Sequence, residues 1–169
     1  MIINKSRFIL GLCFTLLWMG IIFSLSSQPS NQSDETSLGI GRIIAEIVKP
    51  DFEQISADEQ DQLVESWNHA IRKTAHFAEY AILGVFCGFM VLQVSISIKK
   101  GWILAVIMCM LYAISDEVHQ YFVPGRACQV GDICIDTFGA VCGVIVVVFI
   151  RNLWDWKGSH KNSEKSALL

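Results

Sequence analysis

Polar residues recur at helical spacing inside a stretch of the chain that is otherwise apolar. Arg72, His76, Glu79 and Tyr80 stand at i, i+4, i+7 and i+8, so a helix places all four on one face. A histidine beside a carboxylate can act as a general base, and several such groups can ligate a metal. An arginine, in contrast, recognises phosphate and carboxylate groups. This face therefore indicates either an anion-binding site or a catalytic one.

Two later segments carry similar groups. One helical face is formed by Tyr112, Asp116, His119 and Gln120. Glu117 is turned by about 100° from Asp116 on the same helix. In the next apolar segment, Asp132 and Asp136 are one helical turn apart. The fold has to bring these three segments together before their polar residues can share a site.

The composition of the chain identifies the environment of these segments. Of its 169 residues, 53% are apolar and 17% are charged. Soluble globular proteins are less apolar and carry about 25% charged residues. The net charge of −3 and the absence of a basic stripe argue against nucleic-acid binding. The sequence therefore predicts a protein of the lipid bilayer with no nucleic-acid partner.

Four apolar runs are long enough to cross a bilayer as helices. The first, residues 8–25, carries no charge and suffices for a hydrocarbon layer of about 30 Å. Lys5 and Arg7 precede it as in a cleaved signal peptide, but the run exceeds a usual signal core, which favours a membrane anchor. The other expected spans are residues 75–94, 102–122 and 133–150. The expected fold is therefore an all-α, polytopic membrane protein with a bundle of four transmembrane helices.

The lysines and arginines set the expected orientation, because cytoplasmic loops are rich in both. With the N-terminus inside, the cytoplasmic segments hold Lys5, Arg7, Lys99, Lys100, Arg151, Lys157, Lys161 and Lys165. The longer external segments then hold only Arg42, Lys49, Arg72, Lys73 and Arg126. We therefore predict that both termini are cytoplasmic. Residues 26–73 form an outer loop, and residues 151–169 a short, disordered cytoplasmic tail.

The outer loop is expected to contain helices of its own. A polar stretch, residues 26–37, precedes an apolar helical face made of Ile40, Ile43, Ile44, Ile47 and Val48. We predict an additional amphipathic helix that lies in the membrane interface and stops at Pro50. The alternative is a small packed helix that covers the mouth of the bundle. Ser56 and Glu59 match a capping box, so another helix should begin near residue 57 and run into the second span.

Two further patterns concern the packing of the spans. The sequence VPGR at residues 123–126 predicts a type II turn, which returns Arg126 toward the helix ends. Small residues at GxxxG spacing let helix backbones approach closely. These residues are Gly84, Gly88, Gly139 and Gly143.

The predicted orientation brings the polar faces to the same membrane depth. The second and fourth spans begin outside and the third ends outside, so these faces meet in the outer leaflet. We predict one ligand-binding pocket open to the exterior; a purely structural network of ion pairs is the alternative. Its expected members are Arg72, Lys73, His76, Glu79, Tyr80, Asp116, Glu117, His119, Gln120, Arg126, Asp132 and Asp136.

Several motifs follow each other in a set order along the chain. They are FSLSSQP at residues 23–29, Arg72-Lys73-x-x-His76-Phe77-x-Glu79-Tyr80-x-x-Leu83-Gly84, Ser115-Asp116-Glu117-x-His119-Gln120, Pro124-Gly125-Arg126 and Asp132-x-x-x-Asp136-x-x-Gly139. Over residues 8–150, this series resembles the VanZ-like membrane proteins. The resemblance implies a single membrane domain over residues 1–150 in the plasma membrane of a bacterium. It also implies a cell-envelope role linked to resistance against the glycopeptide antibiotic teicoplanin.

Three functions remain open from the sequence. The first is a binding protein for an envelope amphiphile, such as a lipid-linked wall precursor or a lipidated glycopeptide. The second is a membrane-embedded enzyme that uses a histidine and a carboxylate, or a metal held by them, on a lipid-linked substrate. The third is a proton or solute conduit, against which the apolar inner halves of the second and fourth spans argue. We favour the binding protein, and the sequence identifies no cofactor.

Overall fold

The computed structural model describes residues 4–94 and 97–167, with side chains up to Lys157, and within these ranges it is all-α. Five α-helices and one short 3-10 helix follow each other along the described chain. They are α1 (Lys5–Ser26), α2 (Ser30–Val48), η1 (Phe52–Gln54), α3 (Ala57–Val91), α4 (Ile98–Gln120) and α5 (Val130–Ala167).

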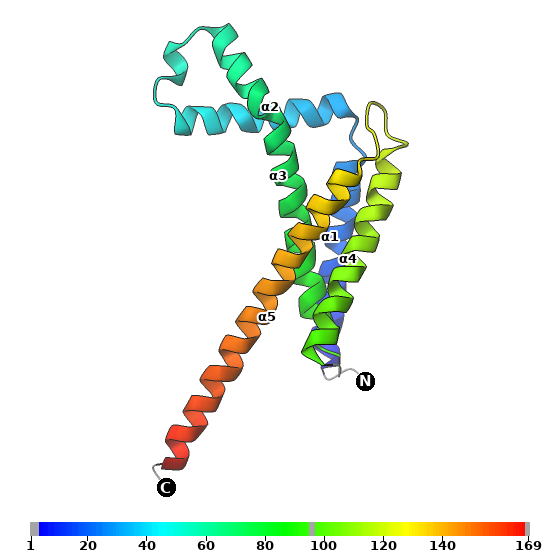
Figure 1. The fold of residues 1–169 in the computed structure, drawn as a ribbon, viewed down its shortest axis with the longest axis vertical. Helices are drawn as coiled ribbons and strands as arrows, with labels where there is room; N and C mark the ends of the chain where they lie inside the picture. The colour runs from blue at the N-terminus through cyan, green and yellow to red at the C-terminus, as the bar shows by residue number, and fades with distance from the viewer. Residues whose placement is uncertain (1–3, 95–96, 168–169) are drawn as a thin grey trace.

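Four of the helices, α1, α3, α4 and α5, are long and apolar enough to cross a membrane. Figure 1 shows them side by side, with α2 lying across one end of the bundle. We call this end, where α1 and α4 finish and α5 begins, the polar end. The predicted spans fall on these four helices, although α3 and α4 end slightly earlier than expected, at Val91 and Gln120. The predicted fold class is confirmed.

The helices α3 and α5 cross at short distance because glycines lie at their contact. At Gly139 and Gly143 of α5, a Cβ atom would overlap a backbone carbonyl oxygen of α3. At Gly84 of α3, a Cβ atom would overlap the backbone of Ala140 in α5. Gly88 has more room, since its nearest neighbour would be a side-chain carbon of Val147 at 3.5 Å. The predicted packing role is thus confirmed for three of the four glycines.

The apolar core of the bundle joins all four long helices. Its largest buried apolar side chains are Tyr80, Ile22, Leu83 and Val144. Trp18 Nε1 donates a hydrogen bond to the Glu79 backbone oxygen at 2.8 Å, and the Tyr112 hydroxyl donates to the Met19 oxygen at 2.6 Å. These bonds tie α1 to α3 and α4. The outward faces of the helices expose large apolar residues suited to lipid, such as Leu17, Leu111 and Phe149.

A helix, α2, contains the predicted amphipathic segment but begins earlier than expected, at Ser30. Its position in a membrane interface stays a prediction. The polar stretch before Ile40 is helical because Pro29 has a φ that suits a helix start and short polar side chains are favourable near helix N-termini. Three small residues pack α2 onto the rest of the chain: Ser37, Gly41 and Ala45. Ile43 and Ile47 remain 59% and 77% exposed, so no other part of the described chain covers them.

The long helix α3 begins as predicted. The Ser56 side chain accepts from the Glu59 N–H, and the Glu59 carboxylate accepts from the Ser56 N–H at 3.0 Å. The helix then continues for 35 residues, from Ala57 to Val91. The helix of the loop and the second span are therefore one element.

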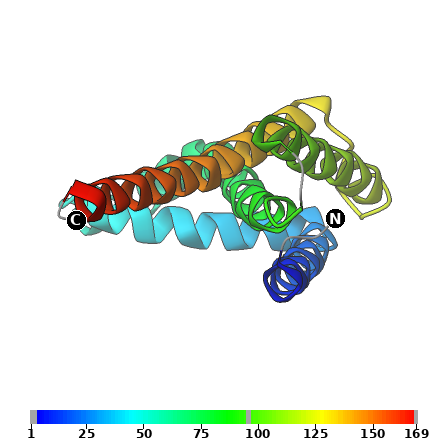
Figure 2. The ribbon, with the colours of Figure 1, turned by 90° about the horizontal axis from the view of Figure 1, so that it is seen from below.

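The prediction that the C-terminal tail is disordered is wrong for residues 151–167. The helix α5 continues past the last span to Ala167, and Figures 1 and 2 show its C-terminal half leaving the bundle. No proline follows Ile150. In addition, Arg151 Nε lies 3.8 Å from Asp155 Oδ2 one turn later, a pairing that stabilises helices. The polar composition of the tail was therefore a poor guide to its structure.

Candidate functional site

A small cleft lies at the polar end, between the end of α1, the first turns of α2, α3 and the turn that follows α4. Its volume is about 110 Å³. The polar side chains that line it include Ser26, Arg72, His76, Glu79 and Arg126, of which the last four were predicted site residues. We call it the polar cleft.

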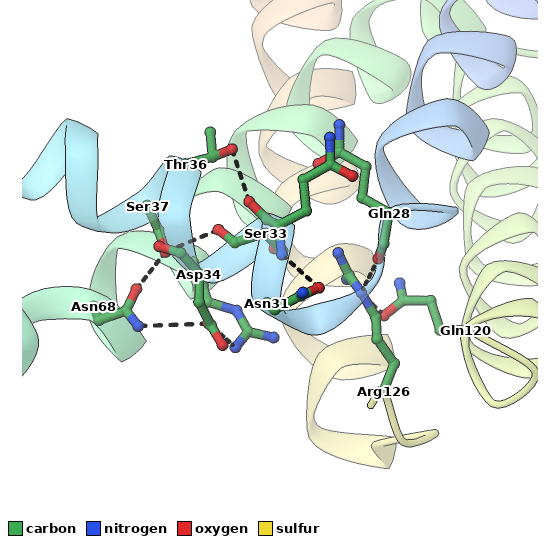
Figure 3. Close-up of polar contacts among 11 residues, drawn as sticks. Gln28, Asn31, Ser33, Asp34, Thr36, Ser37, Asn68, Gln120 and Arg126 are labelled. Atoms are coloured by element: carbon green, nitrogen blue, oxygen red, sulfur yellow. Dashed lines mark hydrogen bonds and ion pairs between the residues drawn. The ribbon is translucent and has the colours of Figure 1, made fainter. Parts of the chain in front are cut away.

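Arg126 reaches the polar cleft through the turn after α4. Gly125 has a φ of 75°, and the Arg126 N–H donates to the Val123 oxygen at 3.1 Å, as expected for a type II turn. Arg126 Nε donates to the Gln28 backbone oxygen at 2.9 Å, and Nη1 donates to Gln120 Oε1 at 3.2 Å (Figure 3). The guanidinium is thus held in one position.

The Arg126 charge has no close counter-ion in the described part of the chain, where no carboxylate oxygen lies within 4.0 Å of it. Burial and, to a smaller extent, repulsion from Arg72 lower the pKa of Arg126 below its ordinary value, while nearby carboxylates act in the opposite direction. An arginine nevertheless stays protonated in proteins. Arg126 is therefore a partly buried, persistent positive charge.

Asp116 is connected to Arg126 through Gln120. Ser26 Oγ donates to Asp116 Oδ2 at 2.8 Å, and Gln120 Nε2 donates to the same oxygen at 3.2 Å. Asp116 is only 3% exposed, and its Oδ1 has no hydrogen-bond partner among the described residues. This chain of contacts fixes the ends of α1 and α4 to the turn.

Two predicted residues of α3 contact the predicted aspartates of α5. Lys73 forms an ion pair with Asp132, and His76 Nδ1 lies 3.4 Å from Asp136 Oδ1. Asp136 is fully buried, and neither of its oxygens makes a hydrogen bond within residues 4–94 and 97–167. Because Nδ1 of His76 is buried against Asp136, Nε2 is the ring nitrogen available to the polar cleft.

The first turns of α2 are fixed beside the polar cleft. Asp34 Oδ1 accepts from Arg72 Nη1 at 2.8 Å and from Asn68 Nδ2 at 3.5 Å. Ser37 donates to the same asparagine through its hydroxyl. Figure 3 shows these contacts together with those of Arg126, near the start of α2. The helix α2 is therefore linked to α3 by charge and by hydrogen bonds.

The remaining predicted residues do not line the polar cleft. Tyr80 is fully buried in the core. Glu117 Oε2 accepts from the Gln129 N–H at 2.8 Å and so fixes the segment before α5. His119 stacks on Phe23, with 4.4 Å between ring centroids. Eleven of the twelve predicted residues divide between the cleft, the α3–α5 contacts and the helix ends, and Tyr80 belongs to the core.

Sequence reasoning gave no role to four polar residues that position the site: Ser26, Gln28, Asp34 and Asn68. Ser26 and Gln28 lie in the FSLSSQP segment, and only the family resemblance indicated that this segment matters. No sequence pattern indicated a role for Asp34 and Asn68, because their contact depends on how α2 packs onto α3.

The arrangement favours anion binding over metal binding. Over the described ranges, no group of three or more His, Cys, Asp or Glu side chains is placed to hold a metal ion. Arg126 can bind a phosphate or carboxylate group, and His76 can accept or donate a proton.

Comparison with protein-family models matches the chain to VanZ/LLP1 over residues 11–151. Comparisons with curated proteins and with solved structures found no match. The matched region covers most of the chain and includes parts of all four helices able to cross a membrane. It also contains every residue of the polar cleft and its neighbouring contacts. The chain therefore belongs to the VanZ/LLP1 family and is a VanZ-like membrane protein.

Proposed function

We propose that this protein binds an envelope amphiphile through an anionic group held by Arg126 in the polar cleft. The supporting observation is the partly buried guanidinium, which no carboxylate in the described chain approaches within 4.0 Å. A buried charge without a counter-ion is costly. A phosphate or carboxylate group on the ligand would remove this cost through charge-assisted hydrogen bonds to the planar guanidinium.

An apolar groove beside the polar cleft suits the hydrocarbon part of such a ligand. Its volume is about 510 Å³, and it lies between α2 and α3. Ile44 and Val48 form part of one wall, and Trp67 forms part of the other. The side chains that line both the groove and the polar cleft are Ile40, Ile71 and Ala75. One molecule with an anionic head and an apolar chain could therefore occupy both.

We further propose that the polar cleft faces the outside of a bacterial plasma membrane, with both termini in the cytoplasm. The lysines and arginines at the opposite end of the bundle support this orientation. Lipid-linked wall precursors and lipidated glycopeptides such as teicoplanin are amphiphiles of this outer surface. Binding of either class would give the protein a role in glycopeptide resistance.

Binding of phosphatidic acid tests the proposal. Native mass spectrometry of protein purified in a neutral detergent measures the fraction that carries the lipid. Arg126→Gln should weaken binding roughly 10-fold or more, because a hydrogen bond to a charged group contributes about 1.5–3 kcal/mol. Arg42→Gln is the matched control, since Arg42 is partly exposed and pairs with Asp61 at 2.6 Å outside the polar cleft. Equal binding by both variants would contradict the proposal.

Catalysis on the bound head group is a second candidate function, favoured by the contact between His76 and Asp136. A buried carboxylate beside Nδ1 would orient the imidazole so that Nε2 takes a proton from a water that attacks the phosphorus. The imidazolium would then return this proton to the diacylglycerol oxygen as the bond between that oxygen and phosphorus breaks. Phosphate release from phosphatidic acid would be measured for the unchanged protein and for Asp136→Asn. If the unchanged protein binds the lipid but releases no phosphate, hydrolysis of this head group is excluded as its function.

A further inference from the structure

Two opposite charges line the polar cleft without forming an ion pair. Glu79 lies on α3, and Arg126 is held across the cleft by Gln28 and Gln120. No nitrogen of Arg126 lies within 4.0 Å of the Glu79 carboxylate. Neither side chain has another ion-pair partner in the chain as described. Both side chains are therefore available to a ligand.

The other charges around the polar cleft already have partners. Arg72 pairs with Asp34 at 2.8 Å, and Lys73 pairs with Asp132. His76 lies against the buried Asp136. The charges left for a ligand are thus one guanidinium and one carboxylate.

A ligand with a single charge fits this arrangement less well than a ligand that carries both charges. A purely anionic head would pair with Arg126, but Glu79 would repel it in an environment of low dielectric constant. A purely cationic head would pair with Glu79 and be repelled by Arg126. A head group that carries both charges satisfies both side chains.

We infer that the ligand is an aminophospholipid, whose phosphate is bound by Arg126 and whose primary ammonium is bound by Glu79. This inference rests on the proposed function and deepens it by choosing, among envelope amphiphiles, a phospholipid in place of a wall precursor or a glycopeptide. The ammonium is primary because a carboxylate needs N–H donors, which a trimethylammonium group lacks. Apart from His76, the described lining contains no aromatic ring on which a trimethylammonium group could stack. The acyl chain lies in the adjoining apolar groove.

Three lipids with identical acyl chains test the inference: phosphatidylethanolamine, phosphatidylcholine and phosphatidylglycerol. Each is titrated into the purified protein in neutral detergent, and bound lipid is measured by native mass spectrometry. Phosphatidylethanolamine should bind roughly 10-fold more tightly than the other two, because it alone presents both a phosphate and N–H donors on a cation. This comparison uses the unchanged protein and does not depend on the folding of a variant.

Glu79→Gln should remove the preference for phosphatidylethanolamine while leaving phosphatidylglycerol binding equal or stronger. Glu46→Gln is the control, because Glu46 is exposed on α2 and does not line the polar cleft. Equal affinity of the unchanged protein for all three lipids would overturn the inference. Stronger binding of phosphatidylethanolamine by Glu79→Gln would also overturn it, since Glu79 would then only compete with the lipid for Arg126. In both cases, the proposed function would still be tested separately, by comparing phosphatidic acid binding between the unchanged protein and Arg126→Gln.

Discussion

Ser26 Oγ donates a hydrogen bond of 2.8 Å to Asp116 Oδ2, which joins the last residue of α1 to α4. Both residues are buried, and the only other hydrogen bond that the carboxylate accepts in the described structure comes from Gln120. A carboxylate in such a position depends strongly on each donor. The contact also holds Asp116 beside the side chain that fixes Arg126.

Ser26→Ala should therefore destabilise the folded protein by about 1–3 kcal/mol, because a buried carboxylate oxygen loses a donor. Ser24→Ala is the control, since Ser24 is exposed and its hydroxyl donates to the Gly20 oxygen within the same helix. Thermal unfolding in detergent measures both variants. Equal stability of the two would show that the bond between Ser26 and Asp116 contributes little.

Gly143→Ala should prevent α3 and α5 from packing as they do. The added methyl group would overlap the Ala81 carbonyl oxygen, which belongs to helical backbone and cannot move aside. A loss of about 1–3 kcal/mol or more is expected, as for other overpacked contacts. Gly20→Ala, with nothing within 4 Å of the new methyl group, should leave stability unchanged or slightly raised. Similar unfolding temperatures for the two variants would contradict this prediction.

The orientation can be tested with single cysteines in a variant whose native cysteines are replaced by serine. A cysteine at Gln62, an exposed position in the first turns of α3, should react with a membrane-impermeant maleimide added to intact cells. A cysteine at Lys99 should react only after the membrane is opened. The reverse labelling pattern would show that the bundle has the opposite orientation, with the polar cleft facing the cytoplasm.

The exposed isoleucines of α2 should bind the membrane interface. Replacing Ile43 and Ile47 by aspartate should release the helix from lipid, because burial of each apolar side chain contributes about 1.5–3 kcal/mol. The loop between α2 and α3 would then be cut faster by a protease added to proteoliposomes. Glu46→Gln, on the same helix, should leave the cleavage rate unchanged, and unchanged cleavage of the isoleucine variant would show that α2 is not docked.

Arg126→Lys should impair function more than folding. Lysine keeps the positive charge but lacks the planar fork that bonds Gln28 and Gln120 while presenting further N–H groups to a ligand. In a teicoplanin-sensitive bacterium, expression of the unchanged protein should raise the inhibitory concentration of teicoplanin. The Arg126→Lys variant, present in the membrane in equal amount, should raise it less. No effect of the unchanged protein would remove the link to resistance.

Much of the fold could be predicted from local patterns. The long spans follow from uncharged runs, the start of α3 from Ser56 and Glu59, and the turn at Gly125 from its proline and glycine. Each of these features depends on residues close together in sequence. The same holds for the helical faces that carried His76 and Asp116.

The parts that could not be predicted depend on contacts between distant segments. The Asp34 contact with Arg72 exists because α2 packs through small residues against α3, and helical periodicity does not specify that partner. Likewise, the spacing of Glu117 and His119 predicted their faces, but not that one would bond the Gln129 N–H and the other would stack on Phe23. The boundary of α5 was missed because a polar sequence can extend a helix once the helix has begun.

The uninterrupted length of α3 exceeds what one crossing of a membrane requires. At 1.5 Å per residue, its 35 residues measure roughly 52 Å, whereas the hydrocarbon layer is about 30 Å thick. Asn68 and Arg72, which contact Ser37 and Asp34 of α2, lie in the first half of α3, and the helix ends at Val91 before α4. A single crossing needs about 20 residues, so the first turns of α3 remain as a surface on which α2 packs, with Gly41 against Val64.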